Sequence, residues 1–278
     1  MNNPKEILKV KDLEVKFGDG CVYCLNGGVL DKGHCPHCHT VWALNKVSFD
    51  LYEGEILGIV GESGSGKSTL LRAVYFDRKI NGGEAYISDY GNGKVNIFDI
   101  SSQKKRYIRN SLMGMVYQNP IMGLRMNFSN GGNISEKLIA AGSRKADSMT
   151  KRAKYLLSHV EVPVSRIKEE PRNFSGGMQQ RVQISKALAN NPPILLLDEV
   201  TTGLDLSVQA RVLDLIKGIQ QELGIAMIVV SHDLSVIRMM ADRTLVMLEG
   251  RIIEEGLTDQ ILEDPAEEFT QTLVHSLL

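Results

Sequence analysis

Hydrophobic and polar residues alternate near the start of the chain and again soon after it. The stretches from Ile7 to Phe17 and from Trp42 to Leu51 both have this pattern, which is typical of strands with one buried face. Short apolar runs follow at residues 56–60, 114–117, 194–197 and 225–230. Such runs, separated by helical segments, predict a parallel sheet covered on both faces. We therefore expect an α/β fold that also contains an antiparallel β region.

Helical spacing fills most of the remaining chain. It runs through residues 119–172, which we expect to form an inserted helical subdomain. Further helices are predicted at residues 177–190 and 208–223 and in the polar tail, 257–278. Turn residues at 81–83 and 91–93 predict a strand-rich stretch after the first helix, and Glu249-Gly250 predicts a late hairpin.

Composition limits the class of protein. The chain has 278 residues, enough for one large α/β domain or two small ones. Its formal net charge of −1 provides no bulk attraction to nucleic acid or anionic membranes. No apolar stretch approaches the roughly 20 residues of a transmembrane helix, and the first residues lack the apolar segment of a signal peptide. We therefore expect a soluble, cytoplasmic protein with no nucleic-acid partner and no membrane insertion.

The sequence GESGSGKS, at residues 61–68, fits the P-loop pattern that holds nucleotide phosphates. An apolar strand is predicted before it and a helix after it, which is the context that the motif requires. Glycines let backbone N–H groups surround phosphate oxygens at the helix N-terminus. Lys67 should reach the β- and γ-phosphates, and Ser68 should bind Mg²⁺. The predicted nucleotide-binding residues here are Gly61, Ser63, Gly64, Ser65, Gly66, Lys67, Ser68 and Thr69.

Two carboxylates follow the apolar run at 194–197. Asp198 is suited to hold Mg²⁺ through water, and Glu199 to polarise an attacking water as a general base. The alternative is an ordinary acidic start to a loop, which a P-loop in the same chain makes less favoured.

A second anion-binding element is predicted at Ser175-Gly176-Gly177. Ser175 is expected to cap a helix whose first backbone N–H groups are exposed by the two glycines. A capped helix with a glycine turn is the simpler interpretation, but it does not explain the whole string from Asn173 to Arg181. Two phosphate-binding elements in one chain suggest that each nucleotide lies between the P-loop of one subunit and this element of another.

With these motifs in this order, the sequence resembles the ATP-binding cassette (ABC) ATPase family over nearly its whole length. The resemblance implies a single nucleotide-binding domain over residues 1–278, with a parallel RecA-like sheet, an antiparallel β subdomain and the helical subdomain. It also implies that Gln118 senses Mg²⁺ and the attacking water, and that His232 holds the γ-phosphate and orients Glu199. Asp205 would contact the partner subunit. The reaction implied is hydrolysis of ATP to ADP and phosphate.

Phe17 occupies the place of the aromatic residue that stacks on adenine, although a lone Phe in a strand is more often a core residue. Val200 stands where the family usually has proline, and this departure removes no catalytic group.

Within the family, Gly123-Leu124-Arg125 and Gly131-Gly132-Asn133-Ile134 look like the ATP-binding subunits of bacterial carbon–phosphorus lyase systems. That resemblance implies a homodimer that docks on the soluble phosphonate-lyase core complex and uses ATP to drive a conformational change in that complex. A second ABC protein is a further candidate partner. The alternative is the ATPase of an oligopeptide- or nickel-type importer. A metal-sensing module without ATPase activity is disfavoured by the intact motifs.

The residues after Gln118 suggest a docking surface. Ile121-Met122-Gly123-Leu124 is apolar, and we expect it to be exposed and to contact a partner. The alternative is that Ile121 and Leu124 pack inside the helical subdomain.

All four cysteines lie within a Cys/His-rich insert at residues 21–40. Cys21, Cys24, Cys35 and Cys38 form two C-x₂-C pairs, a spacing that predicts a closed tetrahedral site for structural Zn²⁺. Iron is the chemical alternative. Free thiols or disulfides are also possible, but a reducing compartment disfavours disulfides. The three histidines of the insert are expected to be exposed.

Overall fold

The computed structural model of the chain describes residues 5–275, in two compact units. The first unit comprises residues 5–100 and 229–275, and the second comprises residues 101–228. The strands are β1 (Glu6–Phe17), β2 (Val41–Tyr52), β3 (Ile56–Val60), β4 (Gly82–Ile87), β5 (Met113–Val116), β6 (Ile194–Asp198), β7 (Ala226–Val230), β8 (Arg243–Leu248) and β9 (Arg251–Leu257).

The helices are α1 (Val22–Leu25), α2 (Lys67–Val74), α3 (Ser102–Tyr107), α4 (Pro120–Gly123), α5 (Asn130–Ala140), α6 (Ala146–His159), α7 (Gly176–Ala187), α8 (Leu206–Leu223), α9 (Leu234–Met240), α10 (Thr258–Glu263) and α11 (Glu268–His275). The predicted segment 119–172 contributes α4, α5 and α6 to the second unit. The predicted tail forms two helices, α10 and α11, with residues 264–267 between them non-helical, and residues 276–278 lie outside the described part of the chain.

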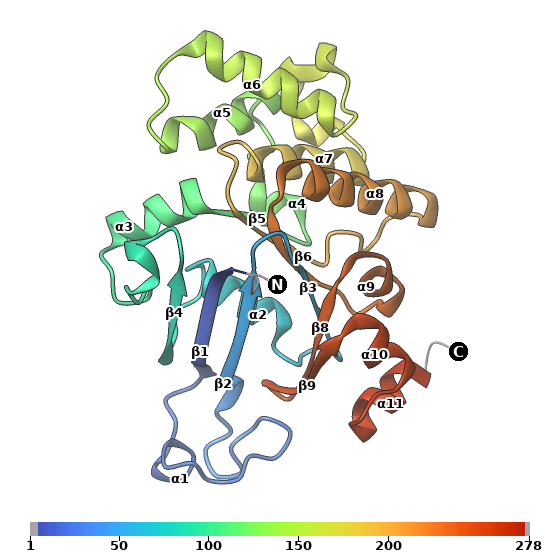
Figure 1. Cartoon of the computed structure of the whole chain (residues 1–278). Helices are drawn as coiled ribbons and strands as arrows, with labels where there is room; N and C mark the ends of the chain where they lie inside the picture. Colours follow the sequence, from blue (N-terminus) through green and yellow to red (C-terminus); the bar gives the residue numbers. More distant parts are fainter. Residues whose placement is uncertain (1–4, 276–278) are drawn as a thin grey trace. The chain divides into compact units, whose positions relative to one another are not determined.

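The first unit contains the predicted antiparallel region, a three-stranded sheet in the order β2-β1-β4 (Figure 1). Leu8 and Val10 are buried at even positions, whereas Leu13 and Val15 are buried at odd ones. The change of phase coincides with a register shift between Val10 and Leu13, where Asp12 has a φ of 46°. A β-bulge therefore keeps all four side chains on the buried face.

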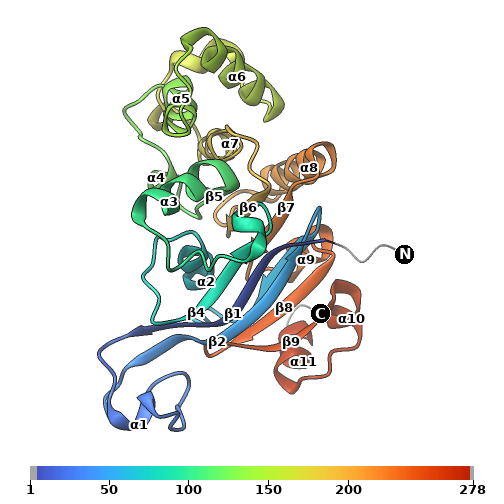
Figure 2. The ribbon, with the colours of Figure 1, turned by 60° about the vertical axis from the view of Figure 1, so that its left-hand side comes forward.

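The other strands of the first unit form a separate set: β3 pairs with β8 in parallel, and β8 pairs with β9 antiparallel. The tight turn at Glu249-Gly250 confirms the predicted late hairpin. Helix α9 packs closely on β3. A Cβ added at Gly58 would lie only 2.9 Å from atoms of Ile237 and Ala241, so the close packing requires glycine at this position. Figure 2 shows the loop that carries α1 extending from the ends of β1 and β2.

The second unit pairs β5 with β6 in parallel, with Met113 opposite Ile194. Helix α7 packs on β5 and also on α5 and α6, which lie together in Figure 1. The side chain of Asn133 is fully buried in α5; its amide donates to the Arg125 carbonyl oxygen and accepts from the Arg125 N–H at 2.8 Å. These two hydrogen bonds give Arg125 and Asn133, which both belong to the sequence after Gln118, a structural role.

The prediction for residues 75–112 was partly wrong. Gly82 and Gly83 begin strand β4 instead of forming a turn, and Gly83 does so with a φ of 103°. The only strand assigned in this stretch of the described chain is β4, and the polar segment after it forms helix α3. Glycine pairs at the start of an edge strand give the same local signal as a turn, which explains the error.

Candidate active site

The P-loop connects β3 to α2 and lies against the β8–β9 hairpin of the same unit. Gly61 has a φ of 145°, and a Cβ at this position would lie 2.1 Å from the Met247 carbonyl oxygen. Gly66 has a φ of 106°, and its Cβ would lie 2.2 Å from the Ala43 carbonyl oxygen. Only glycine fits at these two positions, because both the backbone angle and the space exclude a side chain.

Lys67 begins α2 and turns back over the P-loop. Its side chain is 4% exposed, and Nζ donates to the carbonyl oxygens of Gly61 at 2.8 Å and Glu62 at 2.7 Å. Ser68 and Thr69 are half-buried in the first turn of the helix, while Ser63 and Gly64 are exposed in the loop. The arrangement offers a fixed ammonium group and a helix N-terminus, which together suit a phosphate group.

His232 lies in the same unit, directly after β7. The preceding residue, Ser231, donates its backbone N–H to the carbonyl oxygen of Ile59, two residues before the P-loop begins, at 3.2 Å. The following residue, Asp233, caps α9 by accepting from the Ser235 N–H at 2.8 Å. These bonds fix the backbone on both sides of His232, whose side chain is exposed.

Phe17 ends β1 and does not belong to the core. Its side chain is 40% exposed, and the Arg78 guanidinium lies over the ring, 4.7 Å from the centroid. An exposed ring at this point is compatible with the predicted stacking role and disfavours the alternative of a buried strand residue.

In the second unit, β6 ends at the two predicted carboxylates. Asp198 is fully buried, whereas Glu199 is half-buried and has a φ of 46°. The left-handed region is unfavourable for a residue with a Cβ, and such strain is often found at functional sites. Glu199 Oε2 accepts from Gln118 Nε2 at 2.9 Å and from Thr202 Oγ1 at 3.2 Å. The structure therefore brings together Gln118 and Glu199, which the sequence separates widely.

Gln118 itself follows a residue that α7 holds in place. The Tyr117 N–H donates to Gln183 Oε1 at 2.7 Å, and the Tyr117 carbonyl oxygen accepts from Gln183 Nε2 at 3.0 Å and from Gln180 at 3.3 Å. Sequence analysis did not identify Gln180 or Gln183. The local sequence held no clear signal for them, because the apolar residues of α7 are spread around the helix and do not mark one buried face.

Ser175 and the two glycines after it begin α7. Ser175 Oγ accepts from the Met178 N–H, as expected of an N-cap, and Ser175 and Gly176 are both exposed. Gly177 is buried, and a Cβ there would lie 2.7 Å from a methyl group of Val208. The glycine pair therefore packs against the start of α8, where Asp205 is exposed at the N-cap position.

The predicted docking segment is only partly exposed. Ile121 and Met122 in α4 are 65% and 54% exposed, whereas Leu124 is 5% exposed. The expectation was therefore wrong for Leu124, because this side chain packs inside the second unit.

The four cysteines of the insert form one cluster. Their sulfur atoms all lie within 4.8 Å of one another, and none is in a disulfide. Burial raises the pKa of the Cys35 thiol to about 11, whereas hydrogen bonds from the Thr40 hydroxyl and N–H lower the pKa of the Cys38 thiol to about 6. His34, His37 and His39 are exposed, as expected.

Within residues 5–275, no helix combines the length and hydrophobicity that a membrane span needs.

Comparisons with known proteins agree with this architecture. The sequence pattern of the ABC transporter family matches residues 44–202. The chain is 47% identical, over 91% of its length and 99% of the relative's, to the phosphonates utilization ATP-binding protein PhnK of Escherichia coli strain K12. It is 36% identical, over 98% of its length and 72% of the relative's, to the oligopeptide transport ATP-binding protein OppD of Bacillus subtilis strain 168.

A solved structure has a similar fold. The dimeric ATP-binding cassette MJ0796, in a post-hydrolysis state bound to ADP and phosphate, superposes with a TM-score of 0.76 at 30% identity. The match covers 91% of this chain and 99% of that one.

Proposed function

Because the chain belongs to the ABC transporter family and is an ATPase of that family, we propose that it is the ATP-driven subunit of a phosphonate-degrading enzyme system in the cytoplasm. The observation that carries this proposal is the 47% identity to a phosphonates utilization protein, which extends over 99% of that relative.

In this proposal, Lys67 and the backbone N–H groups of the P-loop bind the β- and γ-phosphates of ATP. The adenine stacks on Phe17. Glu199 accepts a proton from the attacking water, and Gln118 orients that carboxylate through the 2.9 Å hydrogen bond between them. His232 contacts the γ-phosphate from the end of β7.

The family's ATPases use Mg²⁺, and the oxygen donors of this chain fit that ion. Ser68 offers a hydroxyl oxygen, Gln118 an amide oxygen and Asp198 a fully buried carboxylate. Such hard oxygen ligands suit Mg²⁺, which also retains water and phosphate oxygens. Mg²⁺ would neutralise charge on the transferred phosphate. A Zn²⁺ ion at the four cysteines would have no part in the reaction.

We further propose a homodimer in which Ser175, Gly176 and Gly177 contact the nucleotide held by the partner's P-loop. The exposure of Ser175, Gly176 and Asp205 supports their part in this assignment, since groups that contact a partner must be accessible in the single chain, whereas Gly177 is buried and lacks this support. The related cassette MJ0796 is dimeric.

The proposed partner is the soluble enzyme complex that cleaves the carbon–phosphorus bond, and a second ABC protein is a further candidate. Ile121 and Met122 are exposed apolar side chains that suit such a contact. The second candidate function, an importer ATPase, is favoured by the 36% identity to an oligopeptide transport protein.

Affinity purification distinguishes the two functions. A tagged copy, expressed from its own locus in cells that grow on methylphosphonate as their phosphorus source, should co-purify with soluble phosphonate-lyase subunits. A strain without the gene should fail to grow on methylphosphonate but grow normally on phosphate. Co-purification with membrane permease subunits, together with normal growth on methylphosphonate, would support the importer instead.

A further inference from the structure

The insert between β1 and β2 has a small core made largely of cysteine side chains. Cys24, Cys35 and Trp42 are its buried apolar residues, and Cys21, Leu30 and Cys38 pack against them. Other apolar side chains of the insert face solvent, with Val22 78% and Val29 79% exposed. A segment this short cannot bury enough apolar surface to hold a fixed conformation, so it needs another source of stability.

From this cluster we propose that Cys21, Cys24, Cys35 and Cys38 bind one Zn²⁺ ion, which fastens the insert to the end of the β1–β2 hairpin. The proposal goes beyond ATP hydrolysis and does not depend on it.

The distances between sulfur atoms fit a tetrahedral ion. With Zn–S bonds of about 2.3 Å, neighbouring sulfur atoms should lie about 3.8 Å apart. The Cys21–Cys24, Cys21–Cys35 and Cys24–Cys38 sulfur pairs are separated by 3.9, 3.6 and 3.8 Å. A disulfide would require about 2.05 Å. The cluster therefore has the dimensions of a metal site and not of two disulfides.

Hydrogen-bond donors are directed at the sulfur atoms. The Cys21 N–H donates to Cys24 Sγ at 3.2 Å, and the N–H groups of His37 and Cys38 donate to the Cys35 sulfur. Thr40 Oγ1 accepts from the Gly20 N–H at 3.0 Å and lies 3.3 Å from Cys38 Sγ, so its own proton can be donated to that sulfur. Donors arranged in this way orient and stabilise thiolate ligands around a metal.

The ligand set limits the choice of ion. No histidine is needed as a ligand. The rings of His37 and Tyr23 pack edge-on with their centroids 4.5 Å apart, and His34 Nδ1 lies 2.8 Å from the Lys32 carbonyl oxygen. Four thiolates close the coordination sphere, which suits a structural ion and not a catalytic one. Tetrahedral sites of four thiolates hold Zn²⁺ or iron, and Zn²⁺ is favoured because the proposed hydrolysis of ATP calls for no redox-active ion.

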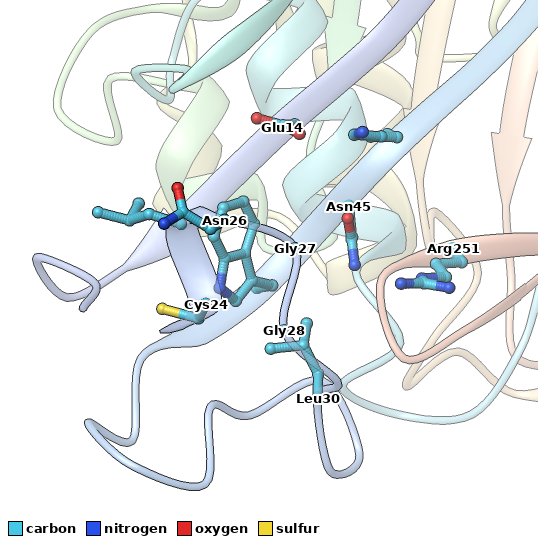
Figure 3. A pocket seen from close by; sticks show the side chains of 11 residues that line it. Glu14, Cys24, Asn26, Gly27, Gly28, Leu30, Asn45 and Arg251 are labelled. Carbon is cyan, nitrogen blue, oxygen red and sulfur yellow. The ribbon is translucent and has the colours of Figure 1, made fainter. Parts of the chain in front are cut away.

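The metal would also shape a neighbouring pocket of about 350 Å³ (Figure 3). Insert residues Cys24 to Gly28 and Leu30 form part of its wall, and Trp42 and Arg251 also line it. Trp42 is the only tryptophan in the sequence and is 8% exposed. Its fluorescence therefore reports specifically on whether the sulfur cluster and this wall are intact.

Elemental analysis of the full-length protein, purified without chelators or added metal, tests the proposal. We expect about one zinc per chain, released by a thiol-reactive mercurial with a red shift of Trp42 emission. Cys35→Ser/Cys38→Ser protein should lose the zinc. His37→Ala, which changes a residue inside the same C-x₂-C pair, should retain it.

ATPase turnover at saturating ATP should be largely unchanged in both variants, so this test and the test of the proposed function can fail separately. Wild-type protein without bound metal would overturn the proposal, as would zinc retained by the double variant. Stoichiometric iron would contradict the assignment of Zn²⁺. The wild-type measurements remain decisive if the double variant does not fold.

Discussion

Gln118 Nε2 donates a 2.9 Å hydrogen bond to Glu199 Oε2, joining two side chains separated by 81 positions in the chain. The bond restricts the rotation of the Glu199 carboxylate, whose backbone already has the strained φ of 46°. A general base works only when its oxygen is within reach of the proton that it accepts. The orientation of Glu199 therefore depends on the residues that hold Gln118.

Gln183 is the residue whose role can be tested most clearly. It is 1% exposed and makes two hydrogen bonds to the Tyr117 backbone. Gln183→Ala should displace Gln118 and lower kcat by roughly 10- to 100-fold, because small errors in the placement of catalytic groups are costly. It should change the KM for ATP much less, and the free energy of unfolding should fall by about 1–3 kcal/mol. Steady-state kinetics and denaturant unfolding measure these effects.

Asn190→Ala is the matched control. The Asn190 amide donates to the carbonyl oxygens of Asn110 and Lys137 in the same unit, without contacting Tyr117. Its removal should lower stability but leave kcat near the wild-type value. Equal losses of kcat in both variants would show that Gln183 acts only through stability.

Much of the fold was predictable from local patterns. The alternation in β1 even contained its bulge, since the buried positions change phase around Asp12. The buried runs at β3, β6 and β7 were also predicted, because strands covered on both faces have continuous apolar sequences. The start of β4 was missed, because Gly82 and Gly83 have the local signature of a turn and only pairing with β1 makes them a strand.

The candidate site was predictable where one motif carries the chemistry. Residues that act through another residue were not predictable, because their role depends on contacts distant in sequence. Gln183 bonds to a backbone 66 positions away, and nothing in its local sequence indicates Tyr117. Leu124 was predicted to be exposed. Its burial results from packing inside the second unit, which the local sequence does not reveal.

The docking surface can be tested at Ile121. Its side chain is 65% exposed, so Ile121→Asp should fold normally and retain ATPase activity. A charge in an apolar contact must be desolvated, and pull-down of the phosphonate-lyase core should fall at least about tenfold. Ile139→Asp is the control, since Ile139 is also exposed in this unit, at 48%, and lies on α5. Equal binding by wild-type and Ile121→Asp protein would exclude this surface.

The composite site can be tested by mixing inactive variants. Lys67→Ala should prevent ATP binding at its own P-loop, and Ser175→Arg should block the site on the partner. A heterodimer of the two retains one intact site, so random mixing should restore up to about a quarter of the wild-type activity. Ser129→Arg removes the equivalent N-cap of α5 and should remain active on its own. A monomeric wild-type ATPase, with activity per chain independent of dilution, would contradict the composite site.

The most direct test of the account is the rate of phosphate release by Glu199→Gln protein. Loss of the general base should lower turnover by about 10²- to 10⁴-fold, while ATP still binds and the ATP-bound dimer accumulates. Glu161→Gln is the matched control, because Glu161 is another acidic residue of the second unit with a left-handed backbone, at a φ of 55°. It should hydrolyse ATP at the wild-type rate. Hydrolysis by Glu199→Gln protein at the wild-type rate would contradict the assignment of Glu199 and the mechanism built on it.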